Sequence, residues 1–243
     1  MIVFRGADGR TLTLEELKGV TGTFRYEGIG DMNVPGEARA LHQQARQAGG
    51  QGNYKKALEL LAQASALAPQ WPYPVYDAAY TRLLMKDFDG AREDYRKTVQ
   101  LSPRGFFTAI TALDTLDREK KGDLPAGIYL AYLSLEWVQD PAQKTKAVRQ
   151  LVEHLPQFAP GWKELAALTN DDDERLAALE KGLAANPDAE TKGMLLINKA
   201  LALNLRGDHD GAVRLLGEVA LDPNSMLDTE HMAKASLALL VKK

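Results

Sequence analysis

The sequence predicts an all-α fold in which about five pairs of antiparallel helices stack as a solenoid, closed by a C-terminal helix and preceded by a short β-containing segment. Three observations predict it. A set of residues recurs at a fixed interval between Ala38 and Pro103. Apolar residues recur at helical spacing over most of the remaining chain. Proline and glycine separate the helical stretches by short connections, so neighbouring helices are expected to be antiparallel.

The recurrence has an interval of 34 residues, and a fixed period of this length indicates stacked repeats. The residues at matching places are Tyr54 and Phe88, Ala57 and Ala91, Leu61 and Tyr95, Ala64 and Thr98, and Pro69 and Pro103. Ala57, Leu61 and Ala64 share one helix face, where the two alanines allow a neighbouring helix to approach closely. Gly52 suits the end of the first helix, and Pro69 ends the second.

These residues resemble the tetratricopeptide repeat (TPR), whose 34-residue unit has small residues at positions 8, 20 and 27 and a proline at 32. Numbering from Ala38 and from Pro72 places two consecutive units in phase, although Gln44, Ala48 and Arg82 depart from the pattern. The last unit matches again through Leu196, Ala200, Leu203, Gly207, Ala212, Leu216 and Val219. The resemblance implies a right-handed superhelix whose concave face binds peptides or partner helices.

The chain is expected to have three parts: an extension and linker at 1–34, TPR-like repeats at 35–224 and a C-terminal capping helix at 225–243. In the first part, Thr13 and Glu16 form a capping-box pattern that predicts a short helix around Leu14–Lys18. Alternation over Thr21–Glu27 predicts a strand. About thirty residues are too few to fold alone, so this part is expected to pack on the first repeats or on another chain.

Helices are predicted at 36–49, 53–67, 73–85, 88–101, 105–120, 125–138, 142–155, 160–169, 172–185, 190–206, 209–220 and 227–241. The stretch 104–160 is irregular, since three helices share what two positions of the repeat would hold. Which of them pair stays open from the sequence. The last helix is expected to cover the apolar face of the two helices before it, as a cap does in a solenoid.

The net charge of −3 argues against a nucleic-acid partner, because such proteins usually present a basic face. The absence of cysteine excludes disulfides and thiolate metal sites. No stretch approaches the length of a membrane span, and none forms the apolar core of a signal peptide. We therefore expect a cytoplasmic protein without a membrane or nucleic-acid partner; an exported protein with a trimmed leader is the alternative.

No catalytic constellation, metal site or cofactor site is expected. The histidines His42, His154, His209 and His231 lack the spacing of a helical metal pair. The acidic run at Asp171–Glu174 lacks the ligand pattern of a calcium loop and suits the first turn of a helix. No glycine-rich phosphate loop is present, and no serine or threonine has a paired histidine and aspartate pattern.

The candidate binding residues are those that the resemblance places on the concave face. They are His42 and Arg46, then Tyr73, Tyr76, Tyr80 and Leu83, and, in the last unit, Ile197, Asn198 and Leu201. The tyrosines are spaced by three and four residues and therefore share one helix face. Either this face is an open groove, or residues 1–34 or the irregular middle cover it. A TPR subtype that clamps acidic chaperone peptides has Lys and Asn where His42 and Arg46 stand.

These patterns favour a non-catalytic scaffold that binds a protein or peptide partner in the concave groove. The alternative is a structural subunit without a groove, which forms a homo-oligomer through the exposed edge of the Thr21–Glu27 strand. An enzymatic function is not expected, because no converging ionisable groups are apparent in the sequence.

Overall fold

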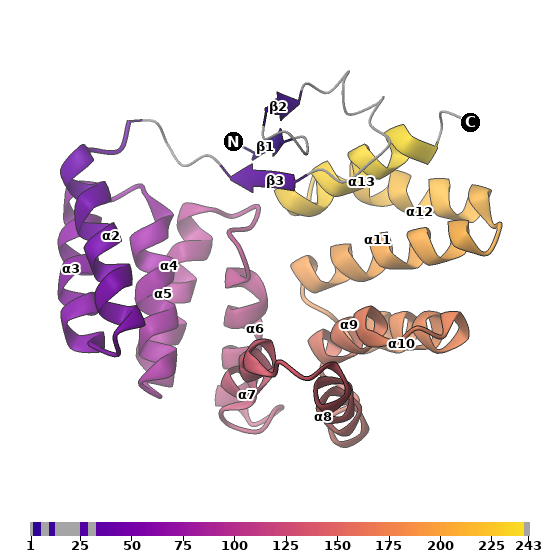
Figure 1. The fold of residues 1–243 in the computed structure, drawn as a ribbon, viewed down its shortest axis with the longest axis horizontal. Coiled ribbons are helices and arrows are strands. Elements are labelled where there is room, and N and C mark those ends of the chain that lie inside the picture. The colour runs from indigo at the N-terminus through magenta and orange to yellow at the C-terminus, as the bar shows by residue number, and fades with distance from the viewer. Residues whose placement is uncertain (1, 6–9, 13–24, 29–32, 241–243) are drawn as a thin grey trace. The chain divides into compact units, whose positions relative to one another are not determined.

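The computed structural model describes residues 2–5, 10–12, 25–28 and 33–240 of the chain (Figure 1). Within these residues it contains twelve α-helices and three short strands. The chain divides into two compact units, one of Gly30–Leu133 and one that combines Met1–Ile29 with Ser134–Lys243. The boundary between them falls inside the stretch 104–160 that the sequence marks as irregular.

The helices of the Gly30–Leu133 unit follow the predicted order. They are α2 (Gly36–Gly50), α3 (Tyr54–Leu67), α4 (Pro72–Leu84), α5 (Phe88–Leu101), α6 (Ala109–Lys121) and α7 (Ile128–Ser134). Consecutive helices α2 and α3, α3 and α4, α4 and α5, and α5 and α6 pack against each other. The 34-residue interval therefore corresponds to one helix pair, as predicted.

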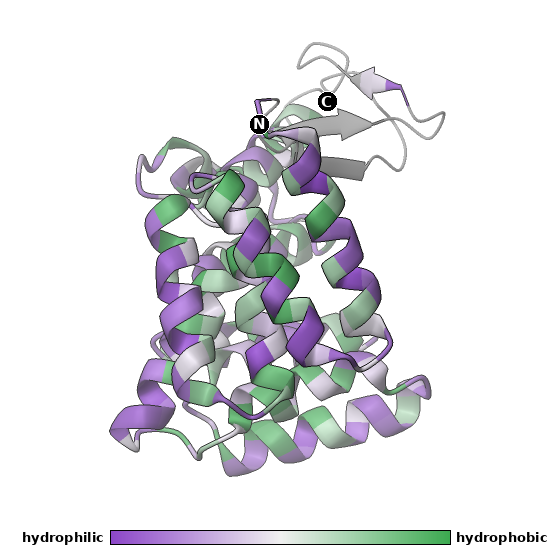
Figure 2. Cartoon of the chain, turned by 90° about the vertical axis from the view of Figure 1, so that its left-hand side faces the viewer, coloured by the Kyte–Doolittle hydropathy of each residue, from purple (hydrophilic) through white to green (hydrophobic). Residues whose placement is uncertain are grey.

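The Ser134–Lys243 part continues with further helices after a 3-10 turn, η1 (Leu135–Trp137). They are α8 (Pro141–His154), α9 (Ala159–Leu168), α10 (Asp172–Ala184), α11 (Ala189–Leu205), α12 (His209–Leu221) and α13 (Leu227–Leu240). Again, α8 packs on α9, α9 on α10, α10 on α11, and α11 on α12. Figure 2 shows hydrophobic and hydrophilic residues interleaved along most helices, as expected where one face of a helix is buried.

The described residues near the N-terminus form a three-stranded sheet. Strand β1 (Ile2–Arg5) lies between β2 (Thr11–Leu12) and β3 (Arg25–Gly28) and is antiparallel to both. The last strand overlaps the end of the strand predicted at Thr21–Glu27. Residues 21–24 and the helix predicted around Leu14–Lys18 lie outside the described residues.

Aspartate side chains cap the first turns of several helices. The N-cap residues Asp87, Asp140, Asp171, Asp188 and Asp208 each accept a hydrogen bond from a backbone N–H of the following turn. These bonds satisfy donors that have no partner within the helix. Asp171 begins α10 in this way, and the other acids of the predicted run lie in that helix's first turn, which agrees with their interpretation as helix-start residues.

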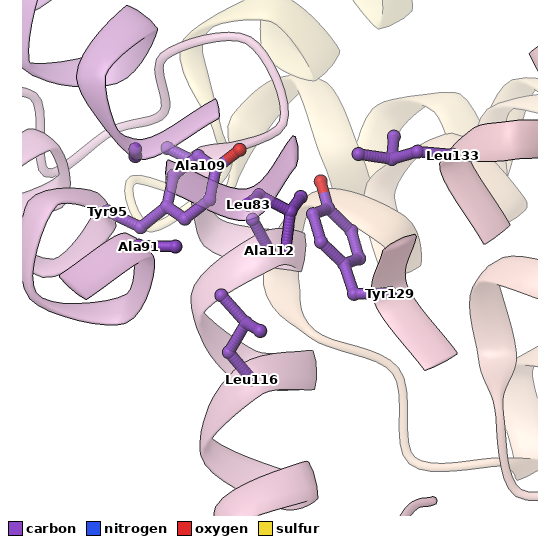
Figure 3. Close-up of a cluster of buried hydrophobic side chains, with 9 residues drawn as sticks. Leu83, Ala91, Tyr95, Ala109, Ala112, Leu116, Tyr129 and Leu133 are labelled. Atoms are coloured by element: carbon purple, nitrogen blue, oxygen red, sulfur yellow. The ribbon is translucent and has the colours of Figure 1, made fainter. Parts of the chain in front are cut away.

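The core of the Gly30–Leu133 unit joins four helices around two buried tyrosines, as Figure 3 shows. It consists of Ala79 and Leu83 from α4, Ala91 and Tyr95 from α5, Ala109, Ala112 and Leu116 from α6, and Tyr129 and Leu133 from α7. Small residues bring the helix backbones close together, and the rings fill the remaining space. This cluster places α6 and α7 with α4 and α5, whereas the next helix, at 141–154, packs on the helix that follows it.

The last helix packs where the sequence predicts it. Helix α13 contacts both α12 and α11, and Ala233 and Leu240 join their buried cluster. The approach is close enough that a Cβ added to Gly193 would lie 2.7 Å from the Cγ2 atom of Thr229. Because real Cβ atoms essentially never come so near, glycine is required at this crossing.

The connection between α5 and α6 differs from the prediction. The sequence predicts a helix from residue 105, whereas α6 begins at Ala109. Gly105 has a φ of 101° and Phe107 a φ of 48°, both in the left-handed region. A left-handed residue cannot continue a right-handed helix, so the residues before Ala109 stay outside it.

Candidate functional site

Helices α2 and α4 bring a histidine, a tryptophan and a tyrosine together at one end of the Gly30–Leu133 unit. The His42 ring lies 4.9 Å from the Trp71 ring and 5.9 Å from the Tyr73 ring, both in edge-on geometry. Trp71 immediately precedes α4, whose first turn tolerates Pro72 because the missing N–H would be unpaired there. Edge-on contacts of this kind stabilise aromatic clusters beyond simple burial.

An ionic contact links the same two helices. The Nε2 atom of His42 lies 2.8 Å from Oδ2 of Asp77, and the Nε atom of Arg46 lies 3.7 Å from the same oxygen. The His42 side chain is only 10% exposed, whereas that of Arg46 is 69% exposed. The histidine therefore ties α2 to α4, while most of the arginine faces solvent.

Two consecutive phenylalanines from the α5–α6 connection pack against the tyrosines of α4. The Phe106 ring lies 4.7 Å from the Tyr73 ring and 5.6 Å from the Tyr76 ring. The Phe107 ring lies 5.6 Å and 5.3 Å from the same two rings. Phe107 nevertheless remains 52% exposed. The connection thus covers part of the tyrosine face and adds an exposed aromatic ring to it.

Hydroxyl groups join this surface to the core. The Oη atom of Tyr76 lies 2.9 Å from the Oγ1 atom of Thr108, and the Tyr129 hydroxyl donates to the same oxygen at 3.2 Å. Below them the Tyr76 ring packs edge-on against Tyr95, which is completely buried. Burial raises the pKa of the Tyr95 phenol well above its ordinary value of 10.0, so the hydroxyl stays protonated at neutral pH.

We call the resulting surface the α2–α4 patch and define it by Arg46, Tyr73, Tyr76, Asp77, Phe106 and Phe107. Its accessible groups are a guanidinium and an aromatic ring, with the other members half-buried. Aromatic and arginine side chains are enriched at the energetic centres of protein interfaces. The chemistry of the patch therefore suits binding of an apolar or aromatic segment.

The structure places the predicted residues of this unit in three different environments. Tyr73, Tyr76 and Tyr80 are half-buried, and Arg46 is exposed. His42 is 8% exposed and Leu83 is fully buried in the core cluster. The expectation that the last two line an accessible face is therefore corrected: His42 is held by its aspartate and tryptophan neighbours, and Leu83 fills the space between α4 and α6.

The predicted residues on α11 belong to the other unit and are described with it. Ile197 is 2% exposed and lies in the cluster shared with α12 and α13, which corrects its placement on an accessible face. Asn198 is half-buried, and Leu201 is 39% exposed. Leu205, one turn further along the same face, is 75% exposed.

Sequence reasoning missed three members of the patch: Asp77, Phe106 and Phe107. In the 34-residue numbering, Asp77 stands at position 6 of the second unit, and Asn198 stands at position 6 of the last unit. Asn198 was selected as a candidate binding residue because of that position, and Asp77 could have been selected for the same reason. Phe106 and Phe107 were both assigned to the helix predicted from residue 105. The adjacent glycine, Gly105, was the available signal that the chain turns there before the helix begins.

A concave region lies in the other unit, between α8 and the start of α10. It is an open cavity of about 680 Å³, lined among others by Lys146, Arg149, Thr169 and Glu174. Arg149 donates to both carboxylate oxygens of Glu174, and Thr169 donates to one of them at 2.6 Å. Since these groups satisfy one another, we do not select this cavity as the functional site.

None of the helices that the structure describes is both long and apolar enough to cross a membrane. Among the described residues, no group of three or more histidine, aspartate or glutamate side chains is placed to hold a metal ion.

Comparisons with known proteins were made at three levels. No protein-family model matches the chain. No curated protein matches it. Similar solved structures include MamA (residue 41 to the end) from Desulfovibrio magneticus RS-1, with 14% identity over 76% of this chain and 94% of that chain and a TM-score of 0.37.

Other similar structures carry the repeat in their names. TTC0263, a TPR protein of Thermus thermophilus, is 19% identical over 82% of this chain and 99% of that chain, with a TM-score of 0.35. The TPR2AB domain of yeast Sti1 in complex with pHSP90 is 17% identical over 83% of this chain and 86% of that chain, with a TM-score of 0.36. The assignment of TPR-like repeats to this chain rests on its own 34-residue interval and helix pairs.

Proposed function

We propose that this protein is a non-catalytic interaction scaffold that binds a peptide or a partner helix at the α2–α4 patch. One observation carries the proposal: an exposed cation, Arg46, contacts Asp77 on α4, the helix that presents the half-buried rings of Tyr73 and Tyr76. Aromatic and arginine side chains that lie together are typical of the energetic centres of protein interfaces. Arginine and tyrosine supply both charge recognition and buried area when a partner covers them.

The test is quantitative capture of partners from extracts of the native cell. Wild type is compared with Arg46→Ala and Tyr73→Ala, and Leu221→Ala is the matched control because that side chain is 82% exposed and lies in the other unit. If both patch residues are interface hot spots, each patch variant should weaken the captured complex roughly thirtyfold, equal to about 2 kcal/mol. Circular dichroism establishes that the variants remain folded.

The outcomes separate clearly. Loss of the same partners from both patch variants, with retention by the control, supports the proposal. Equal capture by all four proteins would place the interaction surface elsewhere on the chain. Any partner that survives can then be mapped against Leu201 and Leu205, which are the exposed apolar residues of α11.

A second candidate function is self-association through the N-terminal sheet. In the sheet that the structure describes, β3 pairs with β1 alone and stands at the edge of the strand order. An edge strand offers unpaired backbone groups to a strand of another chain. The size of the protein in solution, measured by light scattering with and without residues 1–31, tests this candidate. A monomer in both cases would refute it.

A further inference from the structure

The α5–α6 connection occupies the tyrosine face of α4 in the manner of a bound ligand. We call Gly105, Phe106, Phe107 and Thr108 the Phe strap. Its two rings contact the Tyr73 and Tyr76 rings, and its threonine lies within hydrogen-bonding distance of the Tyr76 hydroxyl. The tyrosine face is therefore contacted by two consecutive aromatic rings, Phe106 and Phe107, and by the hydroxyl of Thr108 that follows them.

The strap stays outside the helix to which the repeat assigns it. Helix α4 begins at Pro72, and the residue 34 positions later is Phe106, yet α6 begins only at Ala109. Two left-handed residues keep the strap unwound. Gly105 adopts its φ of 101° easily, whereas Phe107 at 48° is a bulky residue in a sparsely populated region. Phe107 therefore adopts an unfavourable backbone conformation while the strap covers the tyrosine face.

The polar contacts beneath the strap are also incomplete. Among the described residues, the Oη atom of Tyr95 is buried and has no hydrogen-bond partner. The Tyr76 ring, which the strap covers, packs directly against the Tyr95 ring. A buried hydroxyl without a partner is unfavourable, so the covered state leaves a donor unsatisfied next to the tyrosine face.

We propose that the partner of the α2–α4 patch presents two consecutive aromatic side chains and competes with the Phe strap for the tyrosine face. This inference rests on the proposed function and specifies its ligand. The chain's own Phe106–Phe107 pair shows which chemistry fits the face. When the partner binds, the strap leaves, and residues 106–108 are free to wind as the first turn of α6.

The test uses a synthetic peptide with the sequence of residues 102–109, Ser-Pro-Arg-Gly-Phe-Phe-Thr-Ala, carrying a fluorescent label. Its binding to the full chain is followed by fluorescence anisotropy. The double variant Phe106→Ala, Phe107→Ala removes the competing rings. Gly105→Ala keeps both rings but disfavours the left-handed φ that the strap requires. The control peptide has both phenylalanines replaced by alanine.

The peptide is expected to bind the double variant at least about tenfold more tightly than wild type, because a tethered competitor acts at high effective concentration. Gly105→Ala should lie between the two, and the control peptide should bind none of them. Adding Tyr73→Ala to the double variant should abolish binding. If circular dichroism shows that the double variant is unfolded, Gly105→Ala against wild type decides the question.

Equal binding of the peptide to wild type and to the folded variants, or no binding to any of them, would overturn the strap proposal. Neither result depends on a native partner. Should the peptide fail while Arg46→Ala and Tyr73→Ala still lose their captured partner, the interaction function stands and only the aromatic-pair ligand is refuted. Should both experiments fail, the patch itself is refuted.

Discussion

Tyr76→Ala tests whether the tyrosine face of α4 is covered in the free protein. The Tyr76 ring lies 5.7 Å from Tyr95, 5.6 Å from Phe106 and 5.3 Å from Phe107, measured between ring centroids. Its hydroxyl lies 2.9 Å from the Thr108 hydroxyl. The contacts with Phe106, Phe107 and Thr108 exist only while the strap is in place, whereas the contact with Tyr95 on α5 does not depend on it.

The expected magnitude follows from the contacts. Removing a fully buried aromatic side chain costs about 3–5 kcal/mol, and the half-buried Tyr76 should lie at or below the lower end of that range, at about 2–3 kcal/mol. Tyr76→Phe keeps the ring and loses the hydroxyl contact, which is worth about 1 kcal/mol. The two variants therefore separate ring packing from hydrogen bonding.

The assay is urea denaturation followed by far-ultraviolet circular dichroism. The slope m of the unfolding free energy against urea concentration is compared between variants, because an unchanged slope means that they expose the same amount of surface on unfolding. Tyr54→Ala is the matched control, because it removes a half-buried tyrosine from α3 that is not part of the Phe strap's contacts among the described residues. A loss below about 0.5 kcal/mol for Tyr76→Ala, the size of an ordinary surface substitution, would refute the packing described here.

Three further predictions test other parts of the fold. Ala91→Leu should destabilise the protein by about 1–3 kcal/mol, because Ala91 is fully buried where α4 and α5 meet beside Tyr95; unchanged urea unfolding would contradict the repeat phase. Gly193→Ala should lower the melting temperature through its clash with Thr229 on α13, and no shift would mean that α13 docks more loosely. The bonds from Arg149 and Thr169 lower the pKa of Glu174 below its ordinary value of 4.5, so stability that they contribute is present above pH 4.5 and is lost as the pH falls through the lowered pKa. Glu174→Gln should therefore lower the melting temperature at pH 7, and this deficit should shrink as the pH falls through the lowered pKa; a deficit that does not change with pH would show that the effect is not ionic.

The helices were predictable because local and repeating signals agree. Apolar spacing identifies each helix, and the predicted starts at residues 88 and 209 agree with α5 and α12, whose N-cap residues are Asp87 and Asp208. Most boundaries lie within a few residues of the predicted ones. The predicted start of α6, at residue 105, is wrong for a specific reason. Phe106, Ile110 and Leu113 have helical spacing, and nothing in that spacing reveals that Phe107 adopts a left-handed φ.

The candidate site was only partly predictable, since its members come from separate elements. The spacing of Tyr73, Tyr76 and Tyr80 correctly indicates one face of a helix. What covers that face is set about thirty residues later in the chain, by tertiary packing of the Phe strap. Similarly, His42 at its repeat position suggests a binding residue, but its pairing with Asp77 on the next helix makes it a buried contact.

The variant Phe107→Ala tests in one experiment whether Phe107 contacts the partner or competes with it. If the half-exposed ring of Phe107 is itself a contact for the partner, its removal should weaken capture to the same degree as Tyr73→Ala. If Phe107 competes with the partner, as we infer, its removal weakens the cover over Tyr73 and Tyr76 and should strengthen capture. Because the ring is 52% exposed, the variant should lose less than about 1 kcal/mol of stability, so a change in binding is not a folding defect. Weaker capture by this variant would keep the patch as a binding surface and refute the Phe strap as its competitor.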